Sequence, residues 1–175
     1  DCPQWVPPLF VDAYLPLNRK KHPFFTHSEA DFFLAIRDGQ VVGRICAGIN
    51  KPFNEYHRTK KTQFSFFETV DEQPVADALF ASVFDWSRAR GMDTLIGPKG
   101  LSPFDGYGIQ ILGFEHRQMM TMMNYNYAYL PKLVEALGAL NMMQARNRVL
   151  DLPVTRIDAR HPERFALRPT PGGPT

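Results

Sequence analysis

The sequence predicts an α/β (α+β) fold in which helices flank a mixed, twisted β-sheet. Residues 31–50 form two apolar segments joined by Asp38-Gly39, a dipeptide typical of tight β-hairpin turns. Further along, apolar side chains recur at helical spacing, at Val75, Leu79, Val83 and Trp86. Because strand and helix periods alternate along the chain, neither an all-β nor an all-helical arrangement fits them.

The first half of the chain is expected to supply the hairpin of the sheet. Residues 1–28, in which prolines recur, predict an irregular N-terminal strap with one short helical turn at most. The hairpin strands are expected at 31–37 and 40–50. Residues 51–61 are polar and basic and predict a connection, whereas the alternation in 62–68 predicts a third strand.

The second half is expected to alternate helices with strands. Pro74 suits the first turn of a helix over 75–90, which Gly91 ends. A short strand at 93–97 leads into a glycine-bearing loop, which is a functional candidate because of its length. Beyond it we expect a buried strand at 118–123, a helix at 130–137 ended by Gly138, and a last strand at 141–150. The domain is therefore placed at 29–152, with 153–175 as a C-terminal tail or linker.

Composition narrows the class of partner. A chain of 175 residues has the size of one domain, and its 20 basic and 18 acidic side chains are too balanced for a protein that mainly binds nucleic acid. Its two cysteines form no disulfide framework, and no His, Cys or carboxylate grouping has zinc spacing, so we expect no metal and a cytoplasmic protein. No apolar run is long enough to span a bilayer, so stable membrane insertion is not expected.

Several segments resemble the GNAT superfamily of acyl-CoA N-acyltransferases. The resemblance rests on residues 33–44 (FLAIRDGQVVGR), on the helix at 76–92 that ends in Arg-Gly-Met, and on 135–138 (EALG), and it covers 32–150. Four further segments are similar to a divergent bacterial GNAT-like subgroup of unassigned substrate, namely 5–9, 21–25, 50–57 and 123–127. The resemblance implies a GNAT-like sheet and acyl transfer to an amine from acyl-CoA, as acetyl-CoA or a longer thioester.

The chain departs from that family where the cofactor's pyrophosphate would bind. The family's glycine-rich loop, whose N–H groups hold phosphate at a helix N-terminus, is replaced by residues 68–75 (ETVDEQPV). Asp71 and Glu72 would repel phosphate. Val134 stands where the family has the tyrosine that acts as its general acid. A degenerate GNAT-fold binding or scaffolding module without catalysis is therefore kept as the alternative to an enzyme.

Three places carry candidate catalytic residues. Glu68 ends a strand of aromatic residues, whose low polarity would raise the pKa of a carboxylic acid, although a solvated helix-capping role is the simpler alternative. His57 lies in the basic connection beside Glu55, where a solvated imidazole is the alternative to a base. Asp105 lies in the glycine-bearing loop, and Tyr129 is the phenol nearest to the missing family tyrosine, so it is the expected acid.

Donor and acceptor contacts follow from the same resemblance. Residues expected to contact acyl-CoA are Phe66, Phe67, Thr69, Val70, Gln73 and Asn126. Residues expected to contact a small-molecule amine or a lipid-like acceptor are Asn54, Glu55, Tyr107 and Tyr125. The aromatic and methionine content favours an acyl chain longer than acetyl. The oligomeric state is left open, a homodimer included, and the basic-aromatic run at 19–25 admits a peripheral lipid-binding role as a third possibility.

Overall fold

A long antiparallel hairpin forms the centre of the sheet, as the sequence predicts. The computed structural model describes residues 2–120, 123–141 and 154–157. Strand β1 (Glu29–Arg37) pairs with β2 (Gln40–Ile49) from Glu29↔Ile49 to Arg37↔Gln40. Asp38 and Gly39 have φ values of 51° and 77°. Positive φ at both central residues is what a type I′ hairpin turn requires, and the Asp-Gly pair supplies it at low cost.

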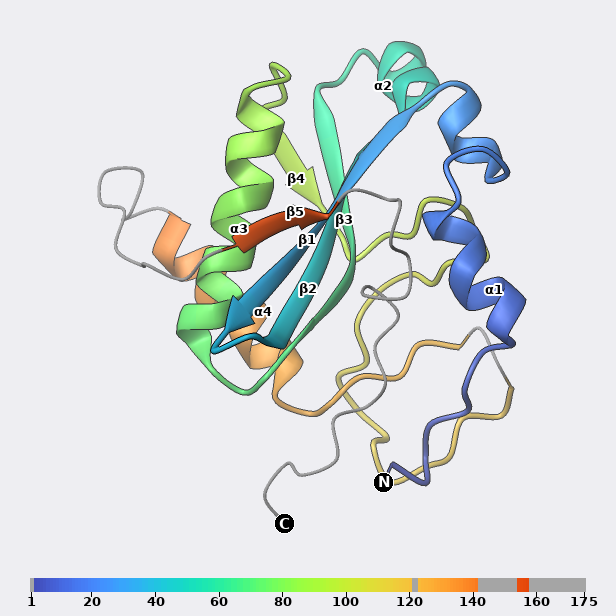
Figure 1. Cartoon of the computed structure of the whole chain (residues 1–175), viewed down its shortest axis with the longest axis vertical. Coiled ribbons are helices and arrows are strands. Elements are labelled where there is room, and N and C mark those ends of the chain that lie inside the picture. Colours follow the sequence, from blue (N-terminus) through green and yellow to red (C-terminus); the bar gives the residue numbers. More distant parts are fainter. Residues whose placement is uncertain (1, 121–122, 142–153, 158–175) are drawn as a thin grey trace.

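The sheet is mixed, so the predicted fold class is confirmed (Figure 1). Its five strands lie in the order β4-β3-β2-β1-β5. Strand β3 (Lys61–Thr69) runs antiparallel to β2, whereas β4 (Thr94–Ile96) runs parallel to β3. Parallel neighbours need a crossover connection, and helix α3 (Gln73–Arg88) provides it at the place where helical periodicity predicts a helix.

The fifth strand comes from a part of the chain that we expected to be tail. Strand β5 (Val154–Ile157) pairs antiparallel with β1, from Phe32↔Ile157 to Ala35↔Val154. It covers the edge of β1, whose N–H and C=O groups would otherwise have no partner strand there. The surrounding prolines outweighed this four-residue segment in the sequence interpretation. The strand predicted at 141–150 lies outside the described residues, except for Asn141, which ends helix α4.

Two other predictions are wrong. Residues 51–61 do not form a simple connection, because helix α2 (Lys51–His57) begins there with the Asn50 side chain accepting the Phe53 N–H at 3.1 Å. The described part of 118–123 forms no strand, and Met119 is 90% exposed instead of buried. Helix α4 (Leu130–Asn141) is confirmed, but it continues past Gly138 instead of ending there.

Two hydrophobic clusters lie on opposite faces of the sheet (Figure 1). Helices α3 and α4 cover one face, where the buried residues include Leu79, Val83 and Leu133. The strap covers the other face with α1 (Phe10–Tyr14), the 3₁₀ turns η1 (Leu15–Leu17) and η2 (Pro23–Thr26), and Leu101 of the glycine-bearing loop. Both faces of the hairpin are therefore buried, which explains why β1 reads as an almost continuous apolar run.

A β-bulge interrupts β3 opposite Ile45. Arg44 pairs with Glu68 and Cys46 pairs with Ser65, so two residues of β3 stand opposite one residue of β2. Phe66 occupies the bulge with a φ of 51°. The extra residue turns Phe64 and Phe67 to the same face, although they are three positions apart. There both rings contact Phe80 of α3, with centroid distances of 5.0 and 4.9 Å.

Truncating Phe80 tests this packing. Phe80 is 3% exposed and lies between two rings of β3, so Phe80→Ala is expected to lower the free energy of unfolding by about 3–5 kcal/mol. Urea denaturation followed by circular dichroism measures the change. The control is Phe84→Ala on the same helix, where the half-buried ring lies under Arg88 and the loss should be clearly smaller. Equal losses for the two variants would contradict the conclusion that Phe80, between Phe64 and Phe67, contributes most to this packing.

Candidate functional site

A cavity lies where β3 and β4 separate. Their ladder ends at Gln63↔Ile96, whereas β3 continues to Thr69. Two hydrogen bonds hold the following loop beside β3: the Lys99 N–H donates to the Phe64 carbonyl at 2.8 Å, and the Gln63 side-chain amide donates to the Gly100 carbonyl at 2.9 Å. The resulting cavity of about 150 Å³ is bounded by residues 65–68 of β3, by parts of the 98–109 loop, by 124–126, and by Arg44 and Leu130. We call it the sheet cavity.

Glycines let the loop fold tightly over this opening. A Cβ at Gly97 would lie 2.5 Å from the Phe64 ring, and a Cβ at Gly100 would lie 2.5 Å from Asp105. The Gly100 N–H donates to the Gly106 carbonyl at 2.9 Å, which closes the loop on itself. The length and glycine content that made this loop a functional candidate in the sequence therefore shape one wall of the cavity.

Buried polar side chains face the sheet cavity. Ser65 is 2% exposed, and its Oγ has no oxygen or nitrogen partner among the described residues. It lies close to the thiol of Cys46, whose pKa burial raises to about 12, so that thiol is neutral. The Asp105 carboxylate accepts the Ser102 N–H at 2.6 Å and lies 3.5 Å from Nε2 of His22, which is buried as well. The Ser65 hydroxyl and the Asp105 carboxylate are thus both largely shielded from solvent.

Glu68 lies at the rim of the cavity, where β3 ends. Its carboxylate forms an ion pair with Arg44 at 3.0 Å, and its side chain is 45% exposed. The pair spans β2 and β3 at the register position Arg44↔Glu68, just beyond the bulge. Glu68 therefore has access to both solvent and cavity, as a group that takes a proton from an incoming amine requires.

Tyr129 is placed beside the cavity and does not line it. Its hydroxyl donates to the Thr69 carbonyl at 2.8 Å, and its ring stacks on Tyr127 at 5.4 Å. Burial raises the pKa of Tyr129 to about 12, and the neighbouring negative charges add to this effect. The phenol is therefore neutral at ordinary pH, but its hydrogen is already engaged. Convergence of Tyr129 with Glu68 on a single substrate remains a prediction.

The residues expected to contact acyl-CoA are divided between two environments. Phe66, Phe67 and Asn126 line the sheet cavity. The Asn126 side-chain amide accepts the Gln110 N–H with its oxygen and donates to the Gln110 carbonyl with its nitrogen. Thr69, Val70 and Gln73 do not line it; these residues instead hold the strand end and the start of α3 in place.

The N-terminus of α3 is occupied by protein groups. Pro74 has no N–H, and the Val75 N–H donates to the Glu72 carbonyl at 3.1 Å. Arg37 forms two bonds to the Glu72 carboxylate, at 2.6 and 2.8 Å, which raises the pKa of Arg37 and lowers that of Glu72. A carboxylate with its own cation therefore stands at the helix start where the resemblance to the GNAT superfamily would place a phosphate-binding loop.

The residues expected to contact the acceptor are also separated. Tyr125 lines the sheet cavity, and burial raises its pKa to about 12. Tyr107 is 48% exposed, with the Lys99 ammonium 5.9 Å from its ring. Asn54 clamps the start of β3 through Lys61, at 2.9 and 3.1 Å, so its role is structural. His57 is exposed at the end of α2, where its ring contacts Phe53 and Tyr56.

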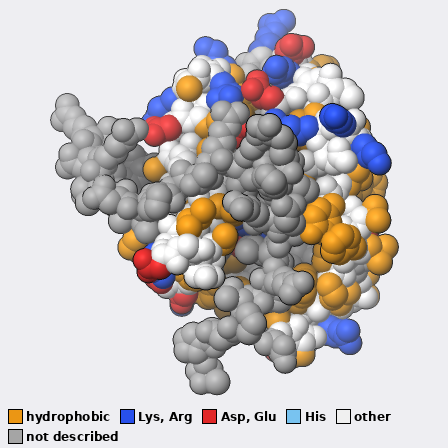
Figure 2. Space-filling view, viewed as in Figure 1, with side chains coloured by type: hydrophobic (Ala, Val, Ile, Leu, Met, Phe, Trp, Pro, Cys, Tyr) orange, Lys and Arg blue, Asp and Glu red, His pale blue; other side chains and the backbone are white. Residues whose placement is uncertain are grey.

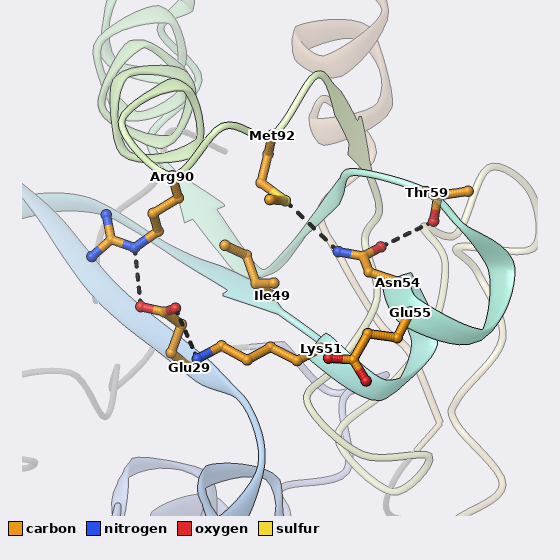
Figure 3. Close-up of a pocket in the computed structure, with 8 residues that line it drawn as sticks. All are labelled: Glu29, Ile49, Lys51, Asn54, Glu55, Thr59, Arg90 and Met92. Carbon is orange, nitrogen blue, oxygen red and sulfur yellow. Dashed lines mark hydrogen bonds and ion pairs between the residues drawn. The ribbon is translucent and has the colours of Figure 1, made fainter.

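A second, wider cavity of about 290 Å³ lies between β1, α2 and the end of α3 (Figure 3). Asn54 and Glu55 line it, so these two expected residues lie away from the sheet cavity. Its charges neutralise one another, since Glu29 binds Lys51 at 3.4 Å and Arg90 at 3.1 Å. Every polar side chain that lines it is at least partly exposed. The sheet cavity, which has buried polar groups, is the stronger candidate site.

Sequence reasoning missed several residues of the sheet cavity, namely Arg44, Ser65, Lys99, Asn124 and, behind Asp105, His22. The alternation of the hairpin could have placed Arg44, but nothing local connects His22 to a loop 83 positions away. Across the described ranges, no group of three or more His, Cys, Asp and Glu side chains could hold a metal ion. No helix of the described structure is long and apolar enough to cross a bilayer.

Comparison with known proteins finds two informative relatives. The chain is 34% identical over 137 residues, 78% of its length, to the bacterial ceramide synthase of Caulobacter vibrioides (strain NA1000 / CB15N). It is 30% identical over 138 residues to the protein YghO of Escherichia coli (strain K12). In each case the aligned part is 35% of the relative, so the chain spans about a third of their length. No protein-family model and no solved structure matches the chain.

The raised pKa of Tyr129 predicts a loss of stability in base. The pKa of a free tyrosine is about 10, whereas burial in the folded protein raises the pKa of Tyr129 to about 12. Its contribution is therefore fully present below pH 10 and is lost as pH rises from 10 toward 12. Urea unfolding at pH 9 and pH 11 should show a smaller loss for Tyr129→Phe than for the unsubstituted protein. An identical loss in the two proteins would contradict the buried position of this phenol.

Proposed function

We propose that this chain carries the catalytic part of an acyltransferase that joins an acyl group to the amine of a lipid-like acceptor. Similarity to a bacterial ceramide synthase supports the proposal, because ceramide is an amide of a fatty acid and a long-chain amino alcohol. The observation that carries it is the sheet cavity, where the aromatic side chains of Phe66 and Phe67 lie beside buried polar groups. An apolar wall suits an acyl chain, and a few fixed polar groups suit the reacting centre.

In the proposed reaction the amine nitrogen attacks the carbonyl carbon of a thioester. Glu68 takes the proton that the nitrogen loses, and Arg44 holds the carboxylate toward the cavity through their 3.0 Å pair. The C–S bond then breaks, and the thiolate leaves with a proton from a neutral donor. Tyr129 is the candidate donor, and it would have to exchange its bond to Thr69 for one to sulfur.

We propose a fatty acyl thioester, such as a long-chain acyl-CoA, as the donor. The apolar side chains that line the cavity, Phe66, Phe67, Ile109 and Leu130, favour a chain longer than acetyl. Because Glu72 and Arg37 occupy the start of α3, the donor's phosphates would bind elsewhere. Lys99 is the candidate cation for binding them, since it lines the cavity and its ammonium lies against the rings of Phe53 and Tyr107, whereas Arg44 is paired with Glu68.

The second candidate is a binding module without catalysis, which the Arg37–Glu72 pair at α3 favours. Such a module would keep the fold without the phosphate site. Calorimetric titration with acetyl-CoA and palmitoyl-CoA separates the two candidates. The enzyme should bind palmitoyl-CoA with measurable heat, whereas the absence of heat with either thioester would favour the module.

Substitution of Glu68 tests the proposed base. The protein is incubated with palmitoyl-CoA and a long-chain amino alcohol, and the amide product is followed by mass spectrometry. Glu68→Gln is expected to lower kcat about 10²-fold or more, because the amide cannot accept the proton. Glu135→Gln, on the exposed side of α4, should leave kcat unchanged.

An unchanged rate in Glu68→Gln would reject this residue as the base and direct attention to Asp105. In that case Asp105→Asn should show the loss instead, because Asp105 is the other carboxylate that lines the cavity. Circular dichroism of each variant establishes that its fold is intact before the rates are compared.

A further inference from the structure

The exposed apolar side chains of the described structure are concentrated in two segments. Apart from Tyr56 on α2, the large apolar residues with high exposure lie at 9–15 and 104–127. Phe10 is 76% exposed, Val11 is 73% exposed, and Met119 is 90% exposed. In the space-filling view, hydrophobic side chains gather over α1, with lysine and arginine side chains above and below them (Figure 2). Scattered single apolar residues are normal on a surface, whereas a concentration of this kind marks an interaction site.

Hydrogen bonds hold the two segments together. The Gln118 N–H donates to the Gln4 carbonyl at 2.9 Å, and the Gln118 side-chain carbonyl accepts the Val6 N–H at 2.6 Å. Met119 and Met120 come directly after Gln118, which is hydrogen-bonded to the N-terminal segment that leads into α1. We call the combined surface the apolar rim and define it as Leu9, Phe10, Val11, Met119 and Met120.

Positive charge flanks the apolar rim. Lys20 and Lys21 are exposed in the turn that follows η1, where the Asn18 side chain accepts the backbone N–H of each, at 3.1 and 3.2 Å. Neither ammonium forms an ion pair with a carboxylate of a described residue, whereas Arg19 is engaged by Asp31 at 2.8 Å. Asp12 is the acidic side chain on α1 itself. The charge beside the rim is therefore positive on balance.

We infer that the apolar rim is a docking surface for a lipid bilayer that contains anionic lipids. Exposed aliphatic, aromatic and thioether side chains can enter the boundary between headgroups and acyl chains, while neighbouring lysines bind the headgroup phosphates. A second copy of the chain is a poorer occupant, because a two-fold interface would bring the lysine pairs of both copies to the same region. An anionic bilayer satisfies the apolar and the cationic parts together.

The apolar rim is a different part of the chain from residues 19–25, the segment for which the sequence admits a lipid-binding role. Phe24 is 3% exposed and belongs to the core under the strap, and Phe25 lies half-buried beneath Arg19 at 5.4 Å. The aromatic part of residues 19–25 is therefore unable to enter a bilayer without unfolding. In the proposed surface, residues 20 and 21 supply charge, and α1 and Met119 supply the apolar contact.

Docking would place the sheet cavity next to the bilayer. The segment that carries Met119 also contributes Asp105, Tyr125 and Asn126 to the cavity wall. A lipid-like amine could then pass from the bilayer to the cavity without crossing water. This last link depends on the proposed function, whereas the docking surface itself is inferred from exposure and charge alone.

Vesicle sedimentation with the full chain tests the inference. The protein should sediment with vesicles of phosphatidylcholine and phosphatidylglycerol at low salt, and less with pure phosphatidylcholine. The double variant Phe10→Ser/Val11→Ser should bind at least about tenfold more weakly, because two exposed apolar side chains are removed from the contact. Lys20→Gln/Lys21→Gln should bind about as weakly as the unsubstituted protein does in 0.5 M salt, where charges are screened.

Matched controls keep the outcome decisive. Tyr56→Ser removes an equally exposed ring from α2, and Lys60→Gln removes an exposed lysine away from the rim, so both should bind as the unsubstituted protein does. Absence of binding to anionic vesicles, or equal binding by Phe10→Ser/Val11→Ser, would overturn the inference. The inference would also be overturned if light scattering showed that the protein is a dimer and that this double variant is a monomer. Vesicle binding without any acylation would overturn the proposed function alone.

Discussion

Strand β3 meets two requirements at once, and the bulge at Phe66 reconciles them. Its first part must pair on both sides, with β2 and with β4, while its last part pairs with β2 alone. With one extra residue opposite Ile45, both Phe64 and Phe67 reach Phe80, and Phe66 turns to the strap side. The core under α3 therefore stays continuous past the point where β4 leaves, and the space beside β3 can remain open without a gap in the core.

The groups around that opening are held by partners from distant parts of the chain. Asp105 meets His22 of the strap, Glu68 meets Arg44 of the hairpin, and Tyr129 meets the end of β3. Fixing a side chain in this way lowers the entropy lost when a substrate binds, which is what a reacting centre requires. The start of α3 is closed in the same manner by Arg37, which separates this site from a phosphate-binding helix terminus.

The hairpin and α3 could be predicted because their signals are local. Asp38-Gly39 specifies a turn by its backbone conformation, and apolar side chains at a period near 3.6 specify a helix that packs against the sheet. Helix α2 was predictable in principle, since Asn50 followed by Pro52 is a helix-start signal, but the basic side chains after it dominated the interpretation. Strand β5 was not predictable, because a segment of only four residues forms a strand only where an edge such as β1 is available.

The sequence by itself determined the mixed α/β architecture and singled out the glycine-bearing loop, since these follow from periodicity and glycine content. It also named Glu68, Phe66 and Asp105 as candidate site residues, and all three line the sheet cavity. Tertiary structure alone decided that His57 and Asn54 lie elsewhere, that Ser65 is buried beside the opening, and that Tyr129 bonds to Thr69. The physical reason is that side-chain burial and pairing depend on contacts between residues far apart in the chain, which local patterns do not encode.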